Sequence, residues 1–348
     1  MPHALVVGGL GVVGQGLVRH IAGRPGWRVT ALSRRAPPAP SPARFIPVDL
    51  LDPADAEVKL ADLSDVSHVF FAAYAERPSP AEEVAPNLAM LETVVRRIER
   101  TSASLAHVSL MQGTKAYGTH LGPFKTPARE TDPRHMPPNF YYDQEDFLRA
   151  ASRAAGWTWS ALRPRTVYGY AAGSPMSMTA VIGVYAAISK ELGLPLRFPG
   201  TPGGYRAIQQ AVDTDLLAEA ALWAATEPAC AGEIFNVTNG GLFRWEHLWP
   251  RIAEWFGLPC GPVQTLRLAE VMADKAPLWA RMTAAHGLKP LAYRDLVSWR
   301  FGDFQWHADY DSLVETTKIR RFGFHAIVDD EEMMLRQMAG LRADRVIP

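Results

Sequence analysis

Residues His3–Gly14 read HALVVGGLGVVG, and the fold class can be inferred from them. The run before the glycines predicts a buried strand, and Val12–Gly23 follows a helical pattern. Glycines in a G-x-x-G-x-x-G spacing allow a sharp turn, a close approach to a pyrophosphate and packing of the helix on the sheet. The N–H groups at the start of the helix then face the phosphates. We assign this role to Gly8, Gly11, Val12, Val13 and Gly14. The alternative is a tight turn without a ligand.

Strand-like and helical segments alternate up to about residue 165, which is typical of a parallel sheet built from βαβ units. Strands are expected at His3–Val7, Trp27–Leu32, Arg44–Pro47, His68–Ala72, Leu105–Leu110 and Thr158–Leu162. Helices are expected at Val12–Gly23, Pro53–Ala61, Glu82–Arg100 and Asn139–Ala155. The fold class is therefore α/β, a doubly wound parallel sheet of the Rossmann type.

The alternation breaks down in the second half, where helical stretches are separated by loops rich in glycine and proline. They are expected at Ser174–Leu192, Asp213–Ala225, Trp245–Phe256 and Leu268–Ala285. We predict a nucleotide-binding domain at 1–170, completed by 205–240, and a smaller, mostly helical substrate-binding cap at 171–204 and 241–348. Seven of the ten tryptophans follow residue 220, as core residues or as an apolar pocket wall.

Composition narrows the function classes. The 36 basic residues balance 36 acidic ones, which argues against a nucleic-acid binder that neutralises phosphates. The two cysteines cannot form a disulfide framework and indicate a reducing compartment. No signal peptide and no apolar run of about 20 residues is present, so we expect a cytoplasmic protein without a membrane partner. The sequence shows no metal-ligand cluster, and it leaves monomer and homodimer both open.

The end of the second predicted strand bears on the choice of dinucleotide. A site for NAD usually places a carboxylate there to bind the ribose 2′-hydroxyl. Here the residues are Ser33, Arg34 and Arg35, which suit a 2′-phosphate, so we predict NADPH. A solvated loop start is the alternative. Asp49 and Leu50 follow the third strand, where the adenine is often contacted.

A catalytic tyrosine is expected in the segment Asn139–Asp146, which reads NFYYDQED. The glycine spacing suggests an extended short-chain dehydrogenase/reductase, a superfamily that normally carries Tyr-x-x-x-Lys on a helix. Four residues make about one helical turn, which places the lysine beside the phenol. In this chain Glu145 follows Tyr141 at that spacing, and a carboxylate there disfavours a phenolate.

A cation is available from the segment Ser109–Gly118, which follows the fifth strand and contains Lys115, one of only seven lysines. Ligands of open α/β sheets bind at this carboxyl end of the strands. Together with NFYYDQED and the downstream Gly122-Pro123-Phe124, this segment resembles the progesterone 5β-reductase/iridoid synthase-like reductases, an atypical branch of the superfamily. The resemblance extends along the whole chain.

The resemblance implies roles for particular residues. Tyr141 would be the catalytic tyrosine and Lys115 its cationic partner, and the activity would be NADPH-dependent reduction of a C=C bond conjugated to a carbonyl. The predicted substrate-pocket residues are Phe124, Tyr117 and Tyr142, which are alternatively core or loop-anchoring aromatics. From their positions in the chain, Val167, Ser177 and Met178 are expected near the nicotinamide. Between Tyr117 and Gly122 the chain looks longer than the plant members, so their steroid or iridoid specificity is not carried over.

Two other functions remain open from the sequence. One is a sugar-nucleotide epimerase or dehydratase on the same scaffold, which the missing Tyr-x-x-x-Lys weakens. The other is a non-catalytic NADP(H)-sensing protein, which the presence of both Lys115 and Tyr141 argues against. The predicted substrate is a small apolar carbonyl compound.

Overall fold

The computed structural model describes the whole chain, Met1–Pro348, which divides into two units. Unit 1 consists of Met1–Arg165, Thr214–Thr238 and Val314–Ala326. Unit 2 consists of Thr166–Asp213, Asn239–Leu313 and Ile327–Pro348. The sequence-based division differs from these units in two ways: it places residues 166–170, 205–213 and 239–240 in the nucleotide-binding domain, and residues 314–326 in the cap. Residues 314–326 belong to unit 1 because Phe322 and Phe324 pack against Phe235 and Trp223, with ring centroids 5.2 and 5.3 Å apart.

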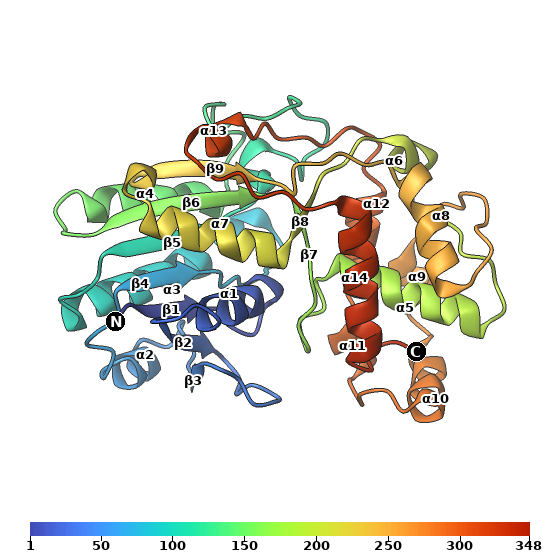
Figure 1. Cartoon of the computed structure of the whole chain (residues 1–348), viewed down its shortest axis with the longest axis horizontal. Helices are drawn as coiled ribbons and strands as arrows, with labels where there is room; N and C mark the ends of the chain where they lie inside the picture. The colour runs from blue at the N-terminus through green and yellow to red at the C-terminus, as the bar shows by residue number, and fades with distance from the viewer. The chain divides into compact units, whose positions relative to one another are not determined.

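The centre of unit 1 is a seven-stranded parallel sheet with the order β3-β2-β1-β4-β5-β6-β9 (Figure 1). Its strands are β1 (His3–Val7), β2 (Arg28–Ser33), β3 (Arg44–Pro47), β4 (His68–Phe71), β5 (His107–Met111), β6 (Thr158–Pro164) and β9 (Glu233–Val237). Each expected strand is present, with ends shifted by two residues at most. The Rossmann-type α/β prediction is confirmed.

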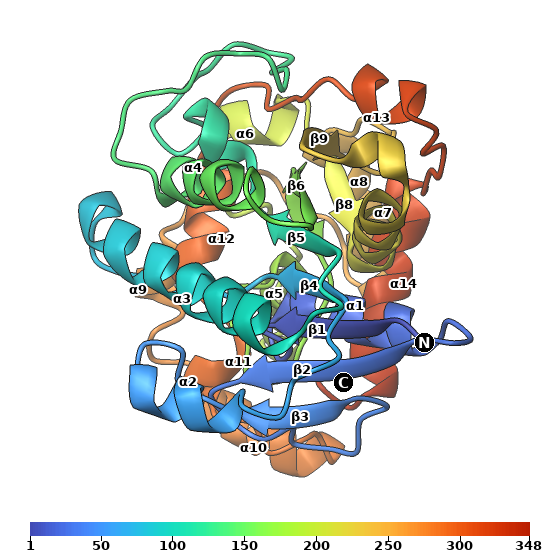
Figure 2. The same ribbon diagram turned by 90° about the vertical axis from the view of Figure 1, so that its left-hand side faces the viewer.

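Helices cover both faces of this sheet. The helical elements of unit 1 are α1 (Val12–Ala22), α2 (Pro53–Lys59), α3 (Pro80–Thr101), η1 (Thr114–Tyr117), α4 (Phe140–Ser152), α7 (Thr214–Thr226), η2 (Pro228–Cys230) and α13 (Thr317–Arg321). Figure 2 shows α3 and α4 on one side of the strands and α1 and α7 on the other. Because both faces are covered, β1 and β4 are almost entirely buried and read as continuous apolar runs.

The strand order reverses between β1 and β4, and this reversal positions the glycine-rich turn. The chain moves outward from β1 to β3, returns to β4 on the other side of β1, and continues to β6. In open α/β sheets a crevice forms at the carboxyl ends of the strands at such a switch point. The turn Gly8–Gly11 directly follows β1, so it lies at that point.

Unit 2 is mostly helical and contains one short parallel pair of strands, β7 (Thr166–Tyr168) and β8 (Ala211–Asp213). Its helices are α5 (Met178–Glu191), α6 (Pro202–Arg206), α8 (Trp245–Phe256), α9 (Leu268–Val271), α10 (Ala276–His286), α11 (Tyr293–Leu296), α12 (Trp299–Trp306) and α14 (Asp330–Ala343). None of the helices in the chain has the length and apolar character that a membrane span requires.

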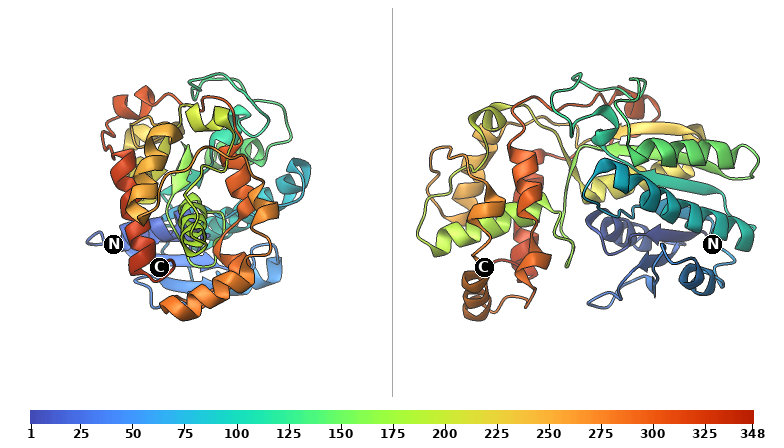
Figure 3. Two further views of the ribbon diagram at one scale, coloured as in Figure 1. Left: turned by 90° about the vertical axis from the view of Figure 1, so that its right-hand side faces the viewer. Right: turned by 180° about the vertical axis from the view of Figure 1, so that it is seen from behind.

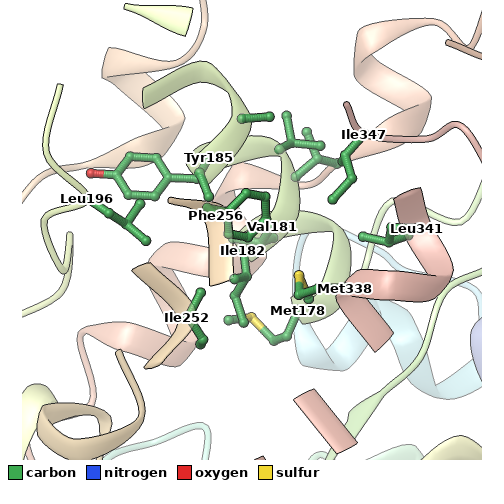
Figure 4. Packing of buried hydrophobic residues seen from close by; sticks show 14 of the residues in the cluster. Met178, Val181, Ile182, Tyr185, Leu196, Ile252, Phe256, Met338, Leu341 and Ile347 are labelled. Atoms are coloured by element: carbon green, nitrogen blue, oxygen red, sulfur yellow. The ribbon is translucent and has the colours of Figure 1, made fainter. Parts of the chain in front are cut away.

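Helix α5 is the centre of unit 2. In the left view of Figure 3 it is seen nearly end-on in light green, with the orange and red helices around it. Its residues from Met178 to Ser189 are all buried, and Figure 4 shows Met178, Val181 and Ile182 packed among side chains of other helices. The late tryptophans contribute to this core. The indoles of Trp245, Trp249 and Trp306 are buried and pack edge to face, with centroids 5.4 to 5.9 Å apart.

The prediction of one helix at Leu268–Ala285 is wrong. Two helices, α9 and α10, occupy this stretch, and Met272–Lys275 separates them. Pro277 lies in the first turn of α10, where the missing N–H of proline is tolerated, whereas inside a continuous helix it would remove a hydrogen bond.

The first turn of α14 contains a buried carboxyl group that makes the stability of the fold depend on pH. Asp330 is 7% exposed; its Oδ1 accepts a hydrogen bond of 2.8 Å from Asn239, and its Oδ2 has no partner. Burial raises the pKa of Asp330 to about 6, with a smaller contribution from the charge of Asp329. The folded state therefore binds this proton more tightly than the unfolded state, and stability falls as the pH rises from about 4 to 6.

Asp330→Asn removes this ionisation and keeps the shape of the side chain. We expect the variant to match the wild type in free energy of unfolding near pH 4 and to exceed it by about 2 kcal/mol at pH 7. Urea unfolding at the two pH values measures the difference. A difference that does not change with pH would contradict the assignment.

Candidate active site

The turn after β1 is shaped by two glycines. Gly8 has φ +85°, and a Cβ built on it would lie 2.9 Å from the backbone of Ala72. A Cβ on Gly14 would lie 2.1 Å from the carbonyl oxygen of Gly8. A larger residue at position 8 would clash with the backbone that follows β4, and one at position 14 would clash with the turn itself. Only glycine at both positions allows this close packing.

The N-terminus of α1 fits a dinucleotide diphosphate. Gly11 caps the helix without a side-chain hydrogen bond, and the first turn holds no acidic residue. A Cβ on Gly11 would meet only the carbonyl oxygen of Gly8, at 3.3 Å, so the space beyond it is open. The first N–H groups of a helix have no acceptor within it, and together with the positive end of the helix dipole they suit an anion. Val12 and Val13 form the start of this helix and are half-buried.

The residues predicted for the adenosine half lie at the ends of the next two strands. Ser33 ends β2 and its hydroxyl donates a hydrogen bond to the carbonyl of Arg35. Arg34 and Arg35 are exposed. Asp49, after β3, is also exposed and its Oδ1 accepts the N–H of Leu51 at 3.0 Å. These positions are consistent with contacts to the ribose and adenine, which remain predictions.

The segments that carry Lys115 and Tyr141 are joined by hydrogen bonds at the carboxyl end of β5. Lys115 lies in η1, and Tyr141 lies in the first turn of α4, where the side chain of the capping residue Asn139 accepts its N–H. The Asn139 amide donates to the carbonyl of Lys115 at 2.9 Å. The Gln112 amide donates to the carbonyl of Tyr141, also at 2.9 Å. The ammonium of Lys115 and the phenol of Tyr141 are not hydrogen-bonded to each other.

The hydroxyl of Tyr141 differs from those of its neighbours. It makes no hydrogen bond within the protein, and it lies at the end of β5, where a Cβ built on Gly113 would be 3.1 Å away from it. Tyr142 donates to the carbonyl of Ala116 at 2.7 Å and accepts the N–H of His135 at 2.8 Å. Tyr141 therefore has a phenol available to donate to a ligand.

The surroundings of Tyr141 keep its phenol protonated. Burial raises the pKa of this tyrosine, the charge of Glu83 raises it further, and the guanidinium of Arg163 acts in the opposite direction. An unperturbed tyrosine already titrates near pH 10. Tyr141 is therefore a neutral hydrogen-bond donor at physiological pH.

A buried polar network lies behind the two segments, and the sequence analysis did not identify it. Arg163, 4% exposed, donates to Gln112 at 2.9 Å, to Glu145 at 3.0 Å and to the hydroxyl of Tyr117 at 3.3 Å. Since Gln112 also holds the carbonyl of Tyr141, the network fixes the backbone at the start of α4. No sequence signal identifies it, because its members come from four separate places: the residue after β5, η1, α4 and β6.

The two carboxylates after the tyrosines pair with arginines. Glu145 is bound by Arg149 at 3.0 Å and by Arg163, also at 3.0 Å. Asp146 is paired with Arg134 at 2.6 Å. Both carboxylates are therefore held by arginines.

The three predicted substrate-pocket aromatics belong to unit 1. Tyr117 is buried and donates to Asn236 at 2.6 Å. Tyr142 is buried as well, and its hydroxyl makes the two hydrogen bonds to Ala116 and His135 described above. Phe124 is half-buried and packs against the cluster of Tyr117, Ala128 and Val314. The first two hydroxyls thus hold the loop, and contact of these rings with a substrate remains a prediction.

The three residues predicted near the nicotinamide belong to unit 2. Val167 is half-buried in β7. Ser177 is fully buried, caps α5 and donates to the carbonyl of Gly169 at 2.6 Å. Met178 is fully buried in the core around α5. Their role toward a cofactor stays a prediction.

Comparison with solved structures shows the same fold. UDP-glucose 4-epimerase from Thermotoga maritima aligns with a TM-score of 0.69 at 18% identity, over 98% of this chain and 99% of that one. UDP-glucose 4-epimerase from Thermus thermophilus, solved in complex with NAD, aligns with a TM-score of 0.68 at 19% identity, over 97% and 99%. At these identities the likeness concerns the fold alone.

Comparison with curated proteins identifies closer relatives. An (S)-8-oxocitronellyl enol synthase from Nepeta racemosa is 35% identical over 99% of this chain and 91% of its own length. A 3-oxo-Δ4,5-steroid 5β-reductase from Arabidopsis thaliana is 33% identical over 99% and 93%. Residues 48–348 match the family model of the PRISE-like Rossmann-fold domain. The resemblance inferred from the sequence is thereby confirmed, and the chain belongs to the PRISE family of oxidoreductases.

Proposed function

We propose that this protein uses NADPH to reduce the C=C bond of small, apolar α,β-unsaturated carbonyl compounds. The observation that carries the proposal is the free hydroxyl of Tyr141, a protonated phenol without an internal partner at the carboxyl end of the sheet. The name of the steroid 5β-reductase relative describes reduction of a C=C bond conjugated to a carbonyl. This supports the same reaction class for the present chain.

The chemistry assigned to the chain's own residues follows from this donor. When bound, NADPH supplies a hydride to the β-carbon of the substrate. Negative charge then develops on the carbonyl oxygen, and the phenol of Tyr141 stabilises it by a hydrogen bond, as an oxyanion-hole donor does. Lys115 adds positive charge to this region, a role that the family resemblance assigns to it. The proton that completes the product at the α-carbon comes from solvent, because Glu145 and Asp146 are held by arginines.

The turn between β1 and α1 would hold the diphosphate of NADPH. The residues at the end of β2 would bind its 2′-phosphate and so favour NADPH over NADH. Ser33, Arg34 and Arg35 provide one hydroxyl and two guanidiniums there, and no carboxylate follows β2. Guanidinium groups bind phosphate by paired, charge-assisted hydrogen bonds.

The double variant Arg34→Ala, Arg35→Ala tests this selection. We expect its affinity for NADPH to fall at least tenfold, about the value of one charge-assisted hydrogen bond, while its affinity for NADH stays unchanged. Isothermal titration calorimetry with both dinucleotides measures this. Arg24→Ala, an exposed arginine beyond the other end of α1, is the control. Equal losses for NADPH and NADH would contradict the 2′-phosphate assignment.

The reaction class is tested by following NADPH consumption with cyclic enones, α,β-unsaturated aldehydes and progesterone, and by identifying the products. Saturated carbonyl compounds support the proposal, whereas allylic alcohols contradict it. Turnover of UDP- or dTDP-sugars without NADPH loss would indicate the epimerase alternative. NADPH binding without oxidation by any substrate would indicate a sensing protein.

A further inference from the structure

One buried carboxylate near Tyr141 has no part in the mechanism above. Glu83 lies in the first turn of α3 and is 7% exposed. It accepts a hydrogen bond from the hydroxyl of Tyr74. Burying a carboxylate costs folding free energy unless the group is paired and hydrogen-bonded. The partners of Glu83 therefore indicate its role.

The second partner of Glu83 is the ammonium of Lys115. The Oε2 atom of Glu83 lies 4.0 Å from Nζ of Lys115. No other carboxylate lies within that distance of the ammonium, and the ammonium donates no hydrogen bond. It also lies 5.5 Å from the centre of the Tyr74 ring, in a cation–π arrangement. Glu83 and Tyr74 are therefore the groups that determine where the charge of Lys115 lies.

The same two residues also influence Tyr141, one through ring contacts and the other through its charge. The ring of Tyr74 stacks on Phe140 at 5.7 Å, and Phe140 packs edge to face on Tyr141 at 4.6 Å. The charge of Glu83 is felt at the phenol, whose pKa it raises. The other charged group that acts on that phenol is Arg163, which lowers its pKa.

Hydrogen bonds from side chains hold the start of α3, which carries Glu83, in place. Asn87, one turn later, donates to the carbonyl of Glu83 at 2.8 Å and to that of Ala75 at 2.9 Å, and its Oδ1 accepts the N–H of Ala75 at 2.8 Å. Gln144 of α4 donates to the carbonyl of Asn87 at 2.9 Å. The segment with Tyr74, the start of α3 and the helix with Tyr141 are thus tied together.

We propose that Glu83 is a positioning residue of the active site, whose carboxylate, oriented by Tyr74, holds the ammonium of Lys115 beside the aromatic cluster that contains Tyr141. The role rests on the proposed enone reduction, in which Lys115 acts near the developing enolate. Glu83 touches no reacting atom in this account and acts through Lys115.

Glu83→Gln tests the proposal, since glutamine keeps the shape and the acceptor for Tyr74 but lacks the charge. The first measurement needs neither cofactor nor substrate: labelling of each lysine with an amine-reactive reagent, followed by peptide mass spectrometry. A paired ammonium must leave its partner before it reacts, so we expect labelling of Lys115 to rise about threefold relative to the other six lysines, the range of a partly exposed ion pair. Glu82→Gln, the exposed neighbour on the same helix, should leave it unchanged.

The second measurement is a kinetic cycle with Lys115→Met. We expect Glu83→Gln to lower kcat about fivefold with KM within twofold, Glu83→Asp to recover part of the loss, and Glu83→Gln to cost nothing further in the Lys115→Met background. Cooperative urea unfolding of each variant verifies that it is folded.

The outcomes separate this inference from the proposed function. Unchanged labelling of Lys115, or an equal kcat loss with and without Lys115, would overturn the inference even if enones are reduced. Increased labelling in a protein that reduces no enone would support the ion pair and overturn the proposed reaction.

Discussion

Tyr141→Phe is expected to lower kcat for enone reduction about a hundredfold, which corresponds to about 3 kcal/mol of transition-state stabilisation, the value of a typical oxyanion-hole donor. The phenol makes no hydrogen bond inside the protein, so its removal leaves no buried partner unsatisfied. The stability of the fold and the affinity for NADPH should therefore stay near wild type. Steady-state kinetics with a cyclic enone measures kcat, NADPH titration measures the affinity, and urea unfolding measures the stability of the variant.

A matched control is Tyr205→Phe, which also removes one phenol hydroxyl. That hydroxyl lies in unit 2 and makes only a long contact of 3.5 Å to the carbonyl of Glu246. We expect kcat to stay within twofold of wild type. Comparable activity in Tyr141→Phe and Tyr205→Phe would rule out Tyr141 as the donor.

Arg163→Met is expected to lower the free energy of unfolding by about 3 kcal/mol, because it breaks a buried ion pair and leaves Gln112 and Tyr117 without a donor. This loss of free energy is at the lower end of the range for breaking a buried ion pair, because Glu145 keeps Arg149 as a partner. Urea unfolding followed by circular dichroism measures it.

Two comparison variants locate the source of this loss. Arg149→Met removes a half-exposed partner of the same carboxylate and should cost less than 1 kcal/mol. Arg163→Met combined with Glu145→Leu should recover part of the stability, since the buried carboxylate that lost its buried partner is gone. If the double variant is less stable than Arg163→Met alone, the loss of this buried ion pair is not the cause.

Six of the seven strands of the sheet could be predicted, most directly the central ones, which are buried on both faces; β9 was not among the expected strands. The runs that form β1 and β4 are continuous and apolar, and turn residues or helical patterns separate them, so local sequence was sufficient. The pair β7 and β8 was missed because each strand has only three residues, too few to show a period. The break between α9 and α10 was missed although Pro277 marks it.

The site could be predicted only where one segment carries the signal. Tyr141 and Lys115 each lie in a short motif, and the family resemblance connects the two motifs. Glu83 reads from the sequence as an ordinary acidic residue in the first turn of a helix. Arg163 reads as the end of a strand. Their roles depend on tertiary contacts between distant segments, which neither spacing nor periodicity contains.

The most direct test of the proposed reaction is the fate of the transferred hydrogen. With 2-cyclohexenone and NADPH deuterated at C4, proton and deuterium NMR of the product locate the label. We expect cyclohexanone with deuterium at the β-carbon. Deuterium on the carbinol carbon of 2-cyclohexenol would contradict it.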